Sequence, residues 1–73
     1  MAQIEDVKVG DTLVYHTLVY RIGSNLVYRY KVQEIVMTQN GLAIGCVVLE
    51  HPEGKKGALR VFNKADIEFL EIE

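Results

Sequence analysis

Cysteine and histidine supply the one nucleophile-and-base combination that the sequence offers. Cys46 is the only cysteine, and the two histidines are His16 and His51. A catalytic thiol needs a lowered pKa and an imidazole beside it that takes up its proton. Cys46, however, lies within the apolar run 44–48, and free cysteine is among the residue types that are most often buried. The sequence therefore favours a core cysteine over a catalytic one, and the separations of the three residues match no structural zinc spacing.

Two clusters of charge are more typical of solvated surface than of a catalytic site. Gly54-Lys55-Lys56-Gly57 lacks the G-x-x-x-x-G-K-[ST] pattern that opens a helix in a phosphate loop. A solvated hairpin turn is the favoured interpretation, and a contact with phosphate or an acidic partner is the alternative. Glu68, Glu71 and Glu73 form no convincing acid–base pair. We expect them to protect an exposed sheet edge from strand addition or to contact a basic patch of a partner.

Tyrosines near basic residues form the strongest candidate for a binding surface. This set is Tyr15, Tyr20, Tyr28 and Tyr30 with Arg21, Arg29 and Lys31. Aromatic residues and arginine are enriched in protein-interface hot spots, and platforms for single-stranded nucleic acid use the same residue types. For Tyr28 and Tyr30 the favoured interpretation is that they line the core side of a strand. Tyr20 is expected to be exposed.

The triplet Leu-Val-Tyr recurs at 13–15, 18–20 and 26–28. Structural repeats are about 20 residues or longer, so these triplets are not repeats. The offset between the first two would place them in opposite phases of one straight strand, which predicts a bend or bulge near residues 16–17. The middle triplet is then expected in a loop, where Leu18, Val19 and Tyr20 with Arg21 form a predicted docking surface.

The elements that must position these residues are mainly β. Residues 12–15 are rich in β-branched and aromatic types, which predicts a strand, and 15–26 is expected to be a long loop. From Leu26 to Val32 apolar residues alternate with polar ones, as in a half-buried strand. A slip of that phase near Glu34 indicates a β-bulge.

Turn signals divide the rest of the chain. Asn40-Gly41 predicts a tight hairpin leading into a central strand at 42–49. A loop at 52–57 precedes a strand at 58–62. Asn63 is expected to cap one helical turn, and 67–72 closes the chain as a strand or as a short helix.

This succession matches a small five-stranded barrel of the Src-homology-3 (SH3) type, with a single helical turn before the last strand. Residues 1–73 are expected to form one domain, and a chain this short buries only about 60% of its unfolded surface. Its net charge of −2 argues against a non-specific nucleic-acid binder, which usually carries a positive excess. No apolar run approaches the ~20 residues of a spanning helix, and residues 1–6 do not resemble a signal peptide. A cytoplasmic location is therefore expected.

The opening segment carries a family resemblance. Val-Lys-Val-Gly-Asp-Thr-Leu-Val-Tyr, residues 7–15, resembles the start of the polymerase-interacting module of the CarD family of bacterial transcription regulators. The likeness maps onto Val9, Gly10, Asp11, Val14 and Tyr15. Residues 16–20 depart from the glycine-containing loop that follows in that family.

A second resemblance concerns the whole chain. In length, single-domain character and lack of catalytic groups it is similar to small phage-encoded regulators that bind RNA polymerase, of the Xanthomonas phage type. That resemblance implies a protein that acts in the host cytoplasm on transcription initiation and termination.

Two classes of function follow from the sequence. The first is a non-enzymatic interaction module that binds host RNA polymerase and uses no cofactor, metal, membrane or small-molecule substrate. Its predicted partner-binding residues are Leu18, Val19, Tyr20, Arg21, Arg29 and Lys31. The second is a nucleic-acid-binding barrel of the ribosomal or elongation-factor type, with a footprint of Arg21, Arg29, Lys31, Lys55 and Lys56. An enzyme is disfavoured because the sequence shows no acid–base pair or metal set.

Overall fold

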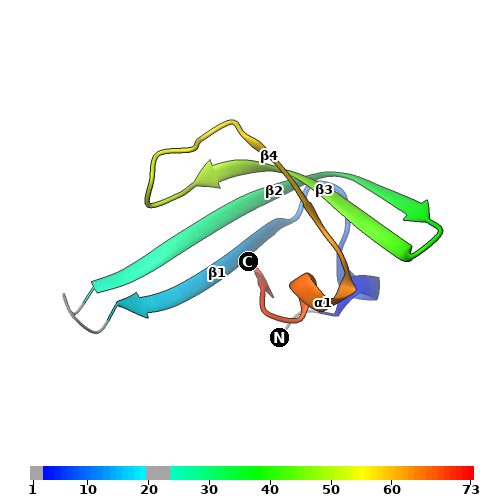
Figure 1. The fold of residues 1–73 in the computed structure, drawn as a ribbon, viewed down its shortest axis with the longest axis horizontal. Helices are drawn as coiled ribbons and strands as arrows, with labels where there is room; N and C mark the ends of the chain where they lie inside the picture. Colours follow the sequence, from blue (N-terminus) through cyan, green and yellow to red (C-terminus); the bar gives the residue numbers. More distant parts are fainter. Residues whose placement is uncertain (1–2, 20–23) are drawn as a thin grey trace.

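Five antiparallel strands form a single sheet in the computed structural model, which describes residues 3–19 and 24–73 (Figure 1). The strands are β1 (Thr12–Val19), β2 (Ser24–Thr38), β3 (Gly41–Glu50), β4 (Leu59–Phe62) and β5 (Glu71–Ile72). A short 3-10 helix, η1 (Ile4–Asp6), precedes them, and the helical turn α1 (Lys64–Ile67) separates β4 from β5. The order across the sheet is β4-β3-β2-β1-β5. The mainly β class, the five strands and the helical turn before the last strand are confirmed.

Strands β1 and β2 form an arm that projects from the body of the sheet (Figure 1). They pair without interruption from Thr12 opposite Lys31 to Val19 opposite Ser24. Strand β3 joins β2 only from Arg29 onward, so no third strand among the described residues pairs with the far end of the β1–β2 pair. The molecule is accordingly elongated, with principal extents of 41 × 24 × 20 Å.

Two predictions for this region are wrong. The expected loop at 15–26 is largely strand, and the register of β1 has no bulge near residues 16–17. The reason is that residues 16–19 satisfy their backbone groups by pairing with residues 24–27, which a loop of apolar residues could not do. Residues 20–23 lie outside the described part of the chain.

The β2–β3 hairpin behaves as its sequence predicts. The register shifts between Val32 and Glu34, which confirms the β-bulge expected there. Gly41 has a φ of +108°, a backbone angle that favours glycine, and Thr38 Oγ1 donates to the Gly41 carbonyl over 2.7 Å. The Asn-Gly turn is therefore confirmed, as is the central position of β3 between β2 and β4.

The helical turn α1 begins with a complete capping box. The Asp66 N–H donates to Asn63 Oδ1 over 2.9 Å, and the Asn63 N–H donates to Asp66 Oδ2 over 3.0 Å. Ile67 and Leu70, three residues apart, are both buried. The segment predicted as a strand or helix at 67–72 is divided between the two, because α1 ends at Ile67 and β5 pairs only Glu71 and Ile72 with Val14 and Leu13.

The core lies between one face of the sheet, α1 and the segments that flank it. It comprises Val7, Leu13, Tyr30, Val32, Ile44, Cys46, Val48, Ile67 and Leu70. The expectation that Cys46 is a core residue is confirmed, since it is 2% exposed. Strands β4 and β5 are the two edges of the sheet and do not pair with each other, so the described residues form an open sheet rather than a closed barrel. None of the helices in these residues has the length and apolar character to span a membrane.

Candidate functional site

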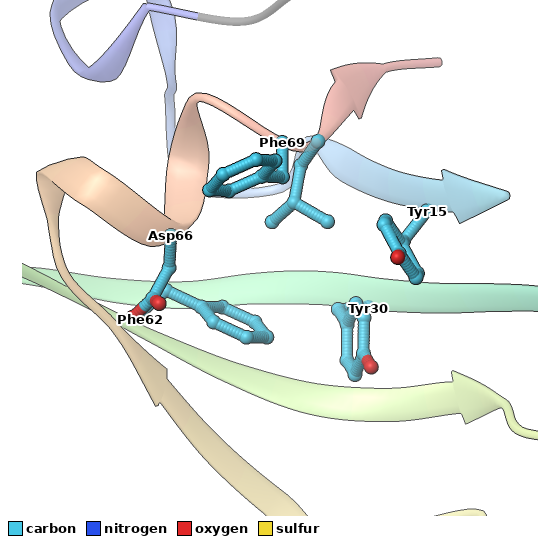
Figure 2. A pocket seen from close by; sticks show the side chains of 6 residues that line it. Tyr15, Tyr30, Phe62, Asp66 and Phe69 are labelled. Atoms are coloured by element: carbon cyan, nitrogen blue, oxygen red, sulfur yellow. The ribbon is translucent and has the colours of Figure 1, made fainter. Parts of the chain in front are cut away.

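An aromatic pocket of about 360 Å³ opens between α1 and the core face of the sheet (Figure 2). Four of its six lining residues are aromatic and one is acidic. Tyr15 comes from β1, Tyr30 from β2, Phe62 from the end of β4, Asp66 from α1, and Phe69 and Leu70 from the segment before β5. Residues far apart in the chain therefore meet in one concave site, which we name the aromatic pocket.

The pairing register of β1 and β2 determines which tyrosines form one wall of this pocket. Leu13 lies opposite Tyr30, and Tyr15 lies opposite Tyr28, so both tyrosines of β2 share the core face with alternate residues of β1. The rings of Tyr30 and Phe62 meet edge to face with centroids 4.9 Å apart, a favoured geometry for aromatic pairs. Because Tyr30 is 8% exposed, this pair forms a fixed wall.

The capping box and its helical turn place the opposite rim. Ile67 and Leu70 face the core, so Phe69 between them is turned outward and is 74% exposed. The Phe69 N–H donates to the Asp66 carbonyl over 3.1 Å, which fixes the backbone that joins the two rim residues. The carboxylate of Asp66 uses Oδ2 in the cap, whereas Oδ1 receives no hydrogen bond from the described residues.

Burial governs the ionisation of two groups beneath the site. Loss of water raises the pKa of Tyr30, and the positive charge of Arg60 works against that shift. Burial also raises the pKa of the Cys46 thiol from 9.0 to about 11. A thiol with that pKa is protonated near neutral pH and is a poor nucleophile.

The histidines are engaged elsewhere or lie apart from the pocket. The His51 ring packs edge-on against Tyr28 with centroids 4.8 Å apart, and its Nδ1 accepts the Glu53 N–H over 3.0 Å. His16 lies on β1 opposite Val27 and is exposed. Across residues 3–19 and 24–73, no cluster of three His, Cys, Asp or Glu residues has a geometry suited to a metal ion.

Tyr28 and Tyr30 line the core side of β2, as predicted. Tyr30 belongs to the buried core, and the half-buried Tyr28 packs against it. The Tyr28 ring also contacts Tyr15, with centroids 5.5 Å apart. The aromatic surface therefore continues from the pocket along β1 and β2 toward the arm.

The predicted partner-binding residues divide into three groups. Leu18 and Val19 lie near the end of β1 in the projecting arm, paired with Asn25 and Ser24. Tyr20 and Arg21 fall outside the described residues. Arg29 and Lys31 lie on β2, and both belong to the phase opposite to Tyr28 and Tyr30, so they point away from the aromatic pocket.

Arg29 is held by carboxylates of its own chain. Its guanidinium pairs with Glu50 through Nη1 and with Glu73 through Nε, the latter over 3.1 Å. Hydrogen bonds to these two carboxylates raise the pKa of Arg29. The residue ties β2 to the end of β3 and to the segment after β5, and a role in partner binding stays a prediction.

The loop predicted at residues 52–57 is confirmed as a turn. Gly54 and Gly57 have φ angles of +70° and +89°, which other residues rarely adopt. Lys55 Nζ lies 3.3 Å from Glu53 Oε2. The expected solvated character of Glu68, Glu71 and Glu73 is also confirmed, since all three are exposed.

The sequence interpretation missed four of the six residues that line the pocket. Phe62, Asp66, Phe69 and Leu70 were not singled out as site residues, although signals for them exist. Asn63 followed by Asp66 fits a capping box, and apolar residues at 67 and 70 with helical spacing turn residue 69 outward. The sequence could not indicate that Asp66 of this turn would share one pocket with Tyr15 and Tyr30.

Comparison with known proteins supplies no relative: no protein-family model, curated protein or solved structure matches the chain.

Proposed function

We propose that this chain is a non-enzymatic interaction module that binds bacterial RNA polymerase and regulates transcription in the cytoplasm. The observation that supports this proposal is the aromatic pocket. It exposes Phe69, together with part of Tyr15, beside a well-packed wall. Aromatic residues in a partly formed concave site are the usual anchors of protein interfaces. The resemblance of residues 7–15 to polymerase-interacting modules supports RNA polymerase as the proposed partner.

The same proposal includes an SH3-like arrangement of strands, in a sheet that stays open between β4 and β5 in the described residues. The strand order β4-β3-β2-β1-β5, with the last strand pairing with the first, supports a meander of this kind. The β-bulge between Val32 and Glu34 adds support, since bulges bend a strand and let a sheet curl. The helical turn α1 before β5 agrees with the same architecture.

The projecting arm would supply a second contact. Leu18 and Val19 lie in the part of β1 that β3 does not reach, which supports their predicted role at a partner surface together with Tyr20 and Arg21. Binding through an arm and a pocket would let a small domain occlude a polymerase segment that another factor occupies. Such a mechanism requires no chemical step.

Co-elution with core RNA polymerase tests the proposal, and Phe69→Ala is the informative variant. Phe69 and Met37 are both 74% exposed, but Met37 lies near the β2–β3 turn and does not line the pocket. We expect the unaltered protein and Met37→Ala to co-elute with polymerase and to change transcription in vitro. Phe69→Ala should bind at least about tenfold more weakly, as hot-spot truncations do.

The proposal is wrong if the unaltered protein neither co-elutes with core polymerase nor alters transcription. A gel-shift titration with single-stranded nucleic acid at two salt concentrations serves as the comparison. Binding that weakens steeply with salt would favour the nucleic-acid alternative. That alternative is less well supported because the net charge is −2, whereas a non-specific nucleic-acid binder usually carries a positive excess.

A further inference from the structure

The aromatic pocket combines ring surfaces with a carboxylate, and this combination has a defined chemical preference. The faces of phenylalanine and tyrosine rings carry partial negative charge and attract cations. Four such rings, from Tyr15, Tyr30, Phe62 and Phe69, line one pocket. Tyr15 and Phe69 are 37% and 74% exposed, so a ligand can reach them without rearrangement of the core.

Asp66 adds a full negative charge to the same lining. Figure 2 shows its side chain beside Phe62, at the edge of the ring cluster. The cap occupies Oδ2, and Oδ1 accepts no hydrogen bond from the described residues, so it can accept one from a ligand donor. Glu68 and Glu71 follow Asp66 in the sequence and add negative charge to this segment, whereas Lys64 precedes it in α1 and Glu73 is paired with Arg29.

No basic residue in the described part of the chain lines the pocket. Arg60 lies two residues before Phe62 on β4 and is near enough to Tyr30 to influence its pKa. Within residues 3–19 and 24–73, Asp66 forms no ion pair with Arg60 or with any other cation. No cation among the described residues therefore pairs with Asp66 or lines the pocket, and a cation of another molecule can approach this carboxylate and the rings.

We propose that the aromatic pocket receives the side chain of an arginine or lysine from a protein partner. The aliphatic stem would pack on Tyr30, Phe62 and Leu70, while the charged head would lie against the exposed ring of Phe69 and reach Asp66. Long basic side chains are suited to this because their stems bury along apolar surface. The assignment of the ligand to a protein rests on the proposed function.

A titration of the isolated protein with Nα-acetyl-arginine N-methylamide tests the chemistry directly. The control ligand is the corresponding citrulline derivative, which has nearly the same shape but no charge. Chemical shifts of the Phe62 and Phe69 ring protons report occupancy, even at millimolar affinity. We expect the arginine probe to bind at least about fivefold more tightly than the citrulline probe, as a cation over an aromatic ring beside a carboxylate requires.

Three variants separate the contributions of the carboxylate and of the ring. Asp66→Asn should remove most of the preference for arginine, whereas Glu68→Gln, with the same change of charge outside the pocket, should leave the preference within about twofold. The amide oxygen that Asp66→Asn introduces can still accept the Asn63 N–H, and the melting temperature shows whether the cap is kept. Phe69→Leu should also reduce the preference, because it keeps apolar surface but removes the ring.

Equal binding of the arginine and citrulline probes overturns the inference. It is also overturned if Asp66→Asn and Glu68→Gln lower the preference by the same factor, because the effect is then one of general charge. These outcomes are distinct from failure of the proposed function. Polymerase can bind in a Phe69-dependent way without any preference for arginine, and the pocket can prefer arginine in a protein that does not bind polymerase.

Discussion

Ile67 links the stability of this small fold to the placement of its pocket. Its side chain is fully buried and holds α1 against the sheet, so that Asp66 and Phe69 lie at the rim. Replacing Ile67 with valine removes one methylene group without changing the backbone of α1. The substitution therefore tests how firmly the helical turn is packed.

The expected loss can be worked out from the burial. One buried methylene contributes about 0.8 kcal/mol, and the residual cavity brings the cost for Ile67→Val to about 1 kcal/mol. For a domain of this size, that loss lowers the melting temperature by about 4–8 °C. Ile67→Ala, which also removes the remaining branches, should cost about 2–5 kcal/mol, a large part of the roughly 4–11 kcal/mol expected for a chain of this length.

Thermal and urea unfolding measure these losses, with Val9→Ala as the control. Val9 is 63% exposed and lies outside the strands and helices, so its truncation should change the free energy of unfolding by less than about 0.5 kcal/mol. Ile67→Val should keep its affinity for polymerase at 25 °C, because the protein remains folded. If Ile67→Val costs no more than Val9→Ala, α1 is not packed on the sheet as described.

Three further predictions concern the cap, the arginine pairs and the cysteine. Asn63→Ala should lower the free energy of unfolding by about 1 kcal/mol, because the Asp66 N–H loses its acceptor. Asn63→Asp, which keeps an acceptor at this position, should lower it much less, and urea unfolding measures both values. The Glu73 N–H donates to the Thr12 carbonyl over 2.9 Å. Arg29→Gln removes the ion pair that holds Glu73, so hydrogen exchange at this N–H should become faster. An unchanged exchange rate would contradict this prediction. Burial raises the pKa of Cys46 from 9.0 to about 11. The contribution of this thiol to the free energy of unfolding should therefore be constant below pH 9 and fall as the pH rises toward 11, where only the unfolded chain readily loses the thiol proton. Cys46→Ala should show a shallower fall over that range.

Local sequence patterns predicted those elements whose conformation depends on residues close together in the sequence. The alternation from Leu26 to Val32 indicated the inner face of β2, and the phase slip indicated the bulge before Glu34. Asn40-Gly41 predicted the hairpin turn, and Asn63 predicted the cap of α1. These features follow from side-chain periodicity, backbone preference and short-range hydrogen bonds, all of which can be read within a few residues.

For residues 15–26, the prediction from local sequence patterns was wrong. The Leu-Val-Tyr triplets suggested a bend, but an uninterrupted partner strand allowed β1 to continue to Val19. A strand pair is stabilised across the sheet, so neither strand by itself reveals its length. The same limit applies to Arg29, whose partners Glu50 and Glu73 are distant in sequence.

The sequence by itself determined a mainly β domain with a capped helical turn before its last strand, an unreactive core cysteine and a chain whose last charges are acidic. Only the tertiary structure decided that the turn would pack against β3 and β4, which brings Phe62, Asp66 and Phe69 into one pocket with Tyr15 and Tyr30. The physical reason is the burial of Ile67 and Leu70, which is favourable because it removes apolar surface from water. The place on the sheet where these two side chains are buried determines which residues lie beside Asp66 and Phe69.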